Sequence, residues 1–188
     1  MSVRKERSYR SATASTSSLV PRLITAVLYE RAARQERARP PDEHLHRRRR
    51  QGTNELNSVV GWCAAGLDRI QNELFDLGAD LSVPYVDGDT KLRITQEAID
   101  RLEQECDDAN AALPELKSFV LPGGDETAAR LFLARSVCRR AERTVLACGD
   151  MNPLAAVYLN RLSDLLFILA RAANASAGVD EPLWRPGS

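Results

Sequence analysis

The chain has 188 residues, of which 44% are hydrophobic and only 5% aromatic, and its 26 Lys and Arg balance 26 Asp and Glu. This length allows one domain with a substantial core, and the scarcity of aromatic residues favours helices packed through Leu, Ala and Val over a β-sandwich. No apolar run approaches the roughly 20 residues that span a bilayer, and the early residues lack a secretory signal. We therefore expect a cytoplasmic protein with no membrane partner.

The neutral total conceals two unlike segments. Residues 1–50 hold 13 Lys and Arg against 5 Asp and Glu, whereas residues 51–188 hold 13 against 21. The first part contains Ser-Thr clusters, a Pro-Pro pair and an arginine run at 47–50, and no hydrophobic pattern repeats there. We expect residues 1–53 to form an atypical, disordered basic segment. A transit peptide and a nucleic-acid arm are alternatives, but no aromatic residues interleave with the arginines, so no nucleic acid is expected.

Residues 54–188 are expected to form the folded domain. Apolar residues recur at three- and four-residue steps from position 54 to about 81, which is typical of amphipathic helices. Gly61 and Gly66 are positions at which this stretch can divide into two helices, and Pro84 lies just beyond its end.

Three further helices follow in the pattern. One is predicted over 95–113 and another over 125–148, each beginning at a residue that caps helix N-termini, Thr95 and Asp125. An Asn-Pro pair at 152–153 opens the last helix, with proline at the first helical position. Since no alternating strand pattern occurs in this part of the chain, the predicted fold is an all-α, antiparallel five-helix bundle with short connections.

Arginines gather on one predicted helix. Arg135, Arg139 and Arg143 are spaced by four, so they share a face, with Arg140 and Glu142 close by. The residues between them are apolar, and an arginine set in such a helix must be solvated, paired or bound to an anion. Two interpretations follow: a solvated face with ordinary Arg–Glu pairs, or an anion site, because guanidinium groups bind phosphate oxygens in bidentate fashion.

The last helix carries a second polar set. Asn160, Arg161 and Asp164 interrupt an otherwise apolar sequence. Asp164 can hold an arginine of the preceding helix, and Asn160 can hydrogen-bond a base or a ribose. Two facing polar sets within an apolar bundle favour a binding site over a solvated surface.

Other candidate residues carry weaker signals. His44 and His46 have no acidic partner at metal spacing, so no metal site made by the protein alone is expected. Phe119 on its own is more typical of a core aromatic than of a ligand contact. The four cysteines form no C-x-x-C pair and are expected to be reduced, buried thiols; they are Cys63, Cys106, Cys138 and Cys148.

Four ordered stretches resemble the PduO-type cob(I)alamin adenosyltransferases. They are I-Q-N-E-L-F-D-L-G-A-D-L (70–81), L-P-E-L-K-S-F-V-L-P-G-G (113–124), A-R-S-V-C-R-R-A-E-R (134–143) and Y-L-N-R-L-S-D-L-L-F-I-L-A-R (158–171). The ending L-W-R-P-G is similar to actinobacterial-looking members. The resemblance implies a five-helix bundle that assembles as a homotrimer with active sites between subunits. It also implies transfer of the 5′-deoxyadenosyl group of Mg²⁺-bound ATP to a reduced corrinoid, with release of triphosphate.

The resemblance also implies roles for single residues. The reduced cobalt attacks the 5′ carbon, so no protein nucleophile is expected, in agreement with the absence of a Ser/His/Asp or Cys/His arrangement. By resemblance, Arg139 and Arg143 bind the ATP phosphates, Glu142 lies near the ribose and the metal, and Asn160 contacts the adenosine. Phe119 matches a phenylalanine that faces the corrinoid and helps to displace its lower axial ligand.

A further set is implied to be structural or intersubunit. Arg135 matches an arginine that forms an intersubunit salt bridge in the family, and Arg140 and Asp164 are placed in the same structural group. Asn54 stands where the family has the aspartate partner of Arg135, in T-N-E-L-N-S instead of V-D-E-L-N-S, so this bridge is expected to be lost or weakened. The connection between the first two helices is also shorter than in the family.

The N-terminal segment departs from the family pattern. Family members begin with a segment like Y-T-R-T-G-D-x-G-x-T that wraps the triphosphate, and nothing in residues 1–53 matches it. One hypothesis is that residues 1–53 are read from a shifted frame that resumes near Glu55, which the nucleotide sequence upstream of that codon would test. The rival hypothesis is a divergent homologue that has lost or rebuilt this loop. The functional alternatives are accordingly an active adenosyltransferase and a non-catalytic bundle that binds corrinoid or a partner protein.

Overall fold

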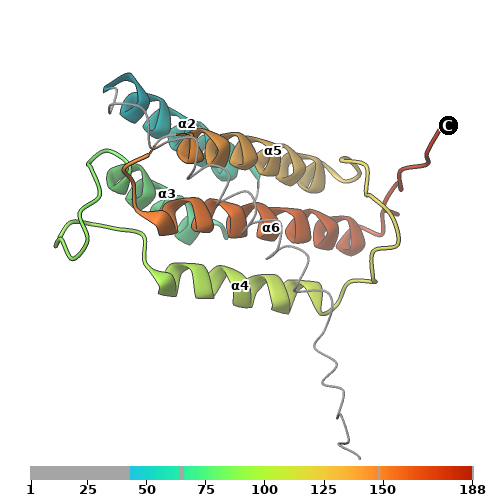
Figure 1. Cartoon of the computed structure of the whole chain (residues 1–188). Helices are drawn as coiled ribbons and strands as arrows, with labels where there is room; N and C mark the ends of the chain where they lie inside the picture. Colours follow the sequence, from blue (N-terminus) through green and yellow to red (C-terminus); the bar gives the residue numbers. More distant parts are fainter. Residues whose placement is uncertain (1–42, 64–65, 148, 188) are drawn as a thin grey trace, which may run out of the picture. The chain divides into compact units, whose positions relative to one another are not determined.

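The structure is a computed structural model that describes residues 43–63, 66–147 and 149–187. Five helices occur in these ranges (Figure 1): α2 (Glu43–Cys63), α3 (Asp68–Asp80), α4 (Gln96–Asn110), α5 (Glu126–Leu146) and α6 (Pro153–Ser176). The same ranges contain no strand, only an isolated antiparallel bridge between Val120 and Leu183. The prediction of an all-α five-helix fold is confirmed.

The helices form an antiparallel bundle in which α6 lies between α4 and α5 (Figure 1). Helix α2 packs on both α3 and α5. Its register on α5 is antiparallel, because Glu55 pairs with Arg140 while Arg49 reaches the carbonyl of Gly149. The core is built from aliphatic side chains on every helix, and the largest side chain that is fully buried is Tyr158 of α6.

Local sequence signals explain where the helices begin and end. The side chain of Asp125 accepts a hydrogen bond from the amide of Thr127, and that of Asn152 accepts one from Leu154, so both act as N-caps. Thr95 stands at the predicted N-cap position of α4, but its side chain makes no capping hydrogen bond. The break between α2 and α3 includes Gly66, whose φ of 94° is in the left-handed region that favours glycine. The predicted division of the first stretch into two helices is confirmed.

The predicted boundary at residue 54 is wrong, because α2 begins at Glu43 and residues 43–53 are helical. Thr53 is fully buried and Arg49 is 3% exposed. A Cβ placed on Gly52 would lie 3.7 Å from the Cα of Ala141, so α2 packs closely on α5 here. This packing overrides the weak helical pattern of the arginine-rich sequence. The remainder of the predicted basic segment, residues 1–42, lies outside the described residues.

Helix α6 is long and apolar enough, by length and composition, to cross a membrane, with a mean hydropathy of 1.4 over its best window. Half of that window is buried inside the bundle, and Leu162 and Leu166 are fully buried. A core helix passes the same test, so this helix alone is weak evidence for a membrane protein.

A buried carboxylate ties three helices together. Glu73 of α3 accepts hydrogen bonds from Arg69 at 2.6 Å, from Arg101 of α4 at 2.9 Å and from the Tyr158 hydroxyl of α6 at 2.8 Å. Burial alone would raise the pKa of Glu73, but the hydrogen bonds from these donors outweigh it and hold the pKa below its ordinary value of 4.5.

We expect Glu73→Gln to lower the free energy of unfolding at pH 7 by about 2 kcal/mol, since it removes the charge that two arginines neutralise. Because the folded pKa lies below the unfolded value of 4.5, the stabilisation is present above that value and is lost as the pH falls through the folded pKa. Urea unfolding should show that the difference in unfolding free energy between Glu73→Gln and the wild-type protein is smaller at acidic pH than at neutral pH. An equal loss at both pH values would contradict this, and the exposed Glu126→Gln serves as control.

Candidate functional site

The polar sets on α5 and α6 meet inside the bundle. Glu142 is 5% exposed, and its Oε1 accepts a hydrogen bond from Asn160 Nδ2 at 3.0 Å. Its Oε2 lies 2.5 Å from Arg139 Nη1 as an ion pair, but no donor is aligned with this oxygen for a hydrogen bond. The structure therefore brings together Arg139, Glu142 and Asn160, as the sequence predicts.

Burial sets the electrostatics of this cluster. It raises the pKa of Glu142, and the hydrogen bond from Asn160 and the charge of Arg139 only partly oppose the rise. The pKa of Asp164 is raised as well, again mainly by burial, against the charges of Arg161 and Arg135. Perturbed carboxylates that lie beside arginines are typical of functional sites, and the unaligned Oε2 of Glu142 is an acceptor for a donor on a ligand.

The four arginines of α5 have different surroundings. Arg139 is one-third exposed and Arg143 is exposed, so both can reach a ligand in solvent. The Arg135 guanidinium lies over the ring of Phe167 on α6, 5.2 Å from its centroid, and its Nε has no hydrogen-bond partner. Arg140 forms an ion pair with Glu55 of α2. Arg139 and Arg143 thus combine positive charge with access to solvent on the predicted phosphate-binding face, whereas the more exposed Arg140 is paired with α2.

Asp164 has a different partner from the predicted one. It pairs with Arg161 of its own helix at 3.1 Å, and Arg161 also approaches Glu103 of α4 at 3.3 Å. Across the described ranges no ion pair joins Asp164 to an arginine of α5. The expectation that Asp164 holds such an arginine is wrong for the single chain, because residues three apart on a helix are immediate neighbours.

Asn54 is exposed on α2 and does not meet Arg135 within one chain. Arg135 points from α5 toward α6, where it contacts Phe167. Helix α2, which carries Asn54, packs on another side of α5, where Arg140 pairs with Glu55. The two positions that an intersubunit bridge joins in the family are therefore not in contact inside one subunit, and the expected loss or weakening of that bridge stays a prediction.

Phe119 lies in the connection between α4 and α5 and is 76% exposed, so its interpretation as a core aromatic is wrong. Its ring packs edge to face on Trp184, with centroids 5.9 Å apart. In the part of the chain that the structure describes, no contact joins Phe119 to the arginines of α5. Trp184 was not predicted as a site residue, and the only signal for it was the L-W-R-P-G ending.

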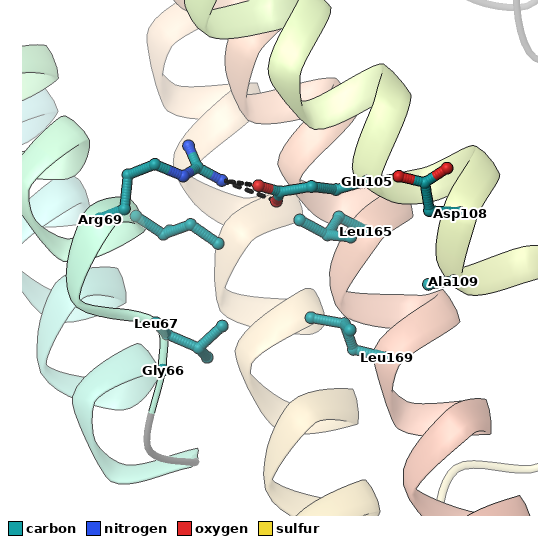
Figure 2. Close-up of a pocket in the computed structure, with 9 residues that line it drawn as sticks. Gly66, Leu67, Arg69, Glu105, Asp108, Ala109, Leu165 and Leu169 are labelled. Atoms are coloured by element: carbon teal, nitrogen blue, oxygen red, sulfur yellow. Dashed lines mark hydrogen bonds and ion pairs between the residues drawn. The ribbon is translucent and has the colours of Figure 1, made fainter.

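A separate cavity of about 300 Å³ lies beside the N-terminus of α3 (Figure 2). Arg69 and Glu105 pair across it above Leu165 and Leu169 (Figure 2). The full lining consists of Gly66, Leu67, Arg69, Ile70, Glu105, Asp108, Ala109, Leu165 and Leu169. None of the predicted site residues belongs to this cavity.

The described cysteines are not activated nucleophiles. Cys63 and Cys138 are buried and unpaired, and Cys106 is partly buried. Burial raises the pKa of Cys106 to about 12 and that of Cys138 further. These three thiols therefore stay protonated at neutral pH, and Cys148 lies outside the described residues.

The arginine cluster lies within the part of the chain that matches a known protein family. A family model described as cobalamin adenosyltransferase matches residues 43–173. The corrinoid adenosyltransferase of Mycobacterium tuberculosis H37Rv is 58% identical over 128 residues, which cover 64% of this chain and 65% of that protein. The enzyme of Mycobacterium leprae is 55% identical over 154 residues, covering 71% and 79%.

A solved structure agrees with these sequence matches. It is a phenylalanine-to-alanine variant of a PduO-type ATP:corrinoid adenosyltransferase from Lactobacillus reuteri, complexed with cobalamin and ATP. Its TM-score is 0.69 at 31% identity, over 75% of this chain and 86% of that one. The chain spans about 65% of the length of the M. tuberculosis relative. Because the family model covers most of the chain, including the Arg139–Glu142–Asn160 cluster, the chain belongs to the cobalamin adenosyltransferase family.

Proposed function

We propose that the protein transfers the 5′-deoxyadenosyl group of ATP to cob(I)alamin or a related corrinoid and releases triphosphate. The observation that carries the proposal is the cluster of Arg139, Glu142 and Asn160, a partly exposed cation beside a buried carboxylate and amide. The names of its relatives, corrinoid adenosyltransferases, support the same reaction.

The chain's own groups act by binding and orientation. Arg139 and Arg143 neutralise the triphosphate, which is the leaving group and carries the developing negative charge. Glu142 accepts a hydrogen bond from a ribose hydroxyl through Oε2, the oxygen that has no aligned donor in the structure. Asn160 holds the Glu142 carboxylate in place through its hydrogen bond to Oε1 and also contacts the adenosine. The corrinoid cobalt is the nucleophile, and the protonated state of the described thiols is consistent with a reaction that uses no protein nucleophile.

A magnesium ion fits this arrangement as a companion of ATP. Mg²⁺ prefers oxygen ligands, keeps several waters and binds through substrate phosphates with one or two carboxylates. Glu142 is the carboxylate of the cluster that would lie near the ion, through one of its waters, while Oε2 accepts the ribose hydroxyl. The described residues include no group of three or more His, Cys, Asp or Glu able to hold a metal ion. The ion would therefore be held mainly by the nucleotide, and it would neutralise phosphate charge.

Phe119 is the corrinoid-facing residue in this proposal. Its exposed ring packs on that of Trp184, and Leu121, two residues further along, is also exposed, so these side chains offer an apolar surface outside the bundle core. Such a surface can exclude water, or an axial ligand, from one face of the corrinoid.

The active site would form between the subunits of a homotrimer in the cytoplasm. Support for the trimer comes from Arg135, whose buried Nε has no partner within one chain, and from Asn54, which is exposed on α2. Unpaired thiols at Cys63 and Cys138 are consistent with a reducing compartment.

We expect Asn54→Asp to strengthen the trimer by restoring a carboxylate opposite Arg135 of a neighbouring subunit. A charge-assisted pair in an interface should lower the dissociation constant about tenfold. Sedimentation velocity over a dilution series measures this, with Asn72→Asp on the exposed face of α3 as the control. Equal dissociation of Asn54→Asp and the wild-type protein would contradict this arrangement.

The alternative function is a non-catalytic bundle that binds corrinoid or a partner protein. The observation that favours it is the absence, from residues 1–53 of the sequence, of a T-R-T-G-D-x-G segment. An assay of the full chain with ATP and chemically reduced cobalamin separates the two functions. We expect adenosylcobalamin and triphosphate in equal amounts; corrinoid binding without either product would establish the alternative.

A further inference from the structure

The C-terminal residues pair with the segment that carries Phe119. The amide of Trp184 donates to the carbonyl of Phe119 at 2.8 Å, and the amide of Leu121 donates to the carbonyl of Pro182 at 2.8 Å. The Ser118 hydroxyl donates to the carbonyl of Trp184 at 3.2 Å. These bonds form a short antiparallel pairing, and they hold the ring of Trp184 edge to face against that of Phe119.

One buried arginine fixes both segments of this pairing. Arg171 of α6 is 3% exposed, and its Nε donates to Glu181 at 2.9 Å while its Nη2 donates to the carbonyl of Pro114 at 2.8 Å. Pro114 precedes Phe119 in one segment, and Glu181 precedes Trp184 in the other. A single guanidinium on the bundle therefore joins the two segments upstream of their aromatic residues.

Phe119 depends on this attachment for its position. Its ring is 76% exposed, so the bundle core does not immobilise it, and its ring contact is with Trp184, itself 46% exposed. A buried guanidinium needs its counter-charge, because removal of one partner leaves an uncompensated charge. Loss of the Glu181 carboxylate should therefore release the C-terminal segment and, with it, the support of the Phe119 ring.

We propose that Arg171 and Glu181 are positioning residues for corrinoid binding, which act by clamping the C-terminal segment against residues 118–121 and so orienting Phe119. The proposal rests on the function proposed above, which assigns Phe119 to the corrinoid. It adds a requirement for an ion pair that touches neither substrate.

The clamp itself is tested by tryptophan fluorescence. The chain has two tryptophans, so Trp62→Phe leaves Trp184 as the only reporter. In that background, Glu181→Gln should shift the emission of Trp184 to longer wavelength and raise its quenching by acrylamide about twofold, as expected for local release of a segment. Unchanged emission and quenching would overturn the proposal, whatever the activity of the protein.

The effect on the substrate is tested by steady-state kinetics of the full chain. Glu181→Gln should raise KM for cob(I)alamin about tenfold and leave KM for ATP within about twofold, because an unpositioned surface binds its own ligand less well. Glu181→Asp, which keeps the charge, should lie closer to the wild-type protein. A merely structural ion pair would shift both KM values together or neither, and either outcome would overturn the proposal.

Glu105→Gln is the matched control, since Glu105 accepts two bonds from one guanidinium, that of Arg69, on the α3–α4 side of the bundle. It should change neither the Trp184 signal nor the KM for cob(I)alamin. If the wild-type protein neither binds nor adenosylates cobalamin, the proposed function fails. The fluorescence of Glu181→Gln still decides then whether the pair holds Trp184 against Phe119.

Discussion

Replacing Arg139 with alanine should raise the Kd for ATP about 100-fold, because it removes a partly buried guanidinium from the face that we propose binds the phosphates. In the structure this guanidinium pairs with Glu142, whose carboxylate is buried and whose pKa is raised by that burial. Without Arg139, the negative charge of Glu142 is left without its nearest cation. The pKa of Glu142 then rises further, and the fraction of Glu142 that stays ionised repels the phosphates and adds to the loss of ATP affinity.

Isothermal titration with Mg-ATP measures this effect on the full chain. Arg130→Ala is the control, because Arg130 lies on the same helix but pairs with Glu126 and stacks on Trp62 at the far end of α5. An ATP affinity that is unchanged in Arg139→Ala would refute the assignment of this face. A similar fall in both variants would point to general loss of positive charge.

The folded part of the chain could be predicted from sequence wherever local chemistry decides the structure. Asp125 and Asn152 cap α5 and α6, since each side-chain oxygen accepts a hydrogen bond from an amide of the first turn that has no partner within the helix. The contact between Glu142 and Asn160 was predictable because both interrupt apolar helical sequences. A buried polar group is costly unless it is hydrogen-bonded, so two such groups on neighbouring helices are expected to pair.

Two of the errors, the boundary at residue 54 and the core position of Phe119, have a common physical origin in long-range contacts. Nothing in the arginine run near residue 49 predicts a helix, but Arg49 is buried and donates to Gly149, one hundred residues away. Phe119 looked like a core residue because phenylalanine usually is one, and its partner Trp184 lies far along the chain. Asp164 shows the reverse case, in which a local partner, Arg161, replaces the expected distant one.

The largest loss of stability is expected for Asp80→Asn. Asp80 is 1% exposed at the end of α3, and its carboxylate accepts bonds from Arg93 at 2.6 Å, from the amide of Ile94 at 2.9 Å and from Asn152 at 2.8 Å. An asparagine places an N–H donor against one of these three donors and leaves Asp89 as the remaining counter-charge of the Arg93 guanidinium. Breaking a buried pair in this way costs about 3–5 kcal/mol, which is a large fraction of the stability of a typical domain.

Asp89→Asn separates this buried effect from the loss of an ordinary ion pair. Asp89 bonds the other end of the same guanidinium at 2.6 Å, from the connection between α3 and α4, where its side chain is 14% exposed whereas that of Asp80 is fully buried. Its replacement should cost about 1–2 kcal/mol, less than that of Asp80, because Arg93 keeps its fully buried partner. Urea unfolding of both variants measures the difference in stability, and equal losses would contradict it.

Because Asn152 both donates to Asp80 and caps α6, we expect Asp80→Asn also to loosen the first turn of α6, which hydrogen exchange of the Leu154 amide would report.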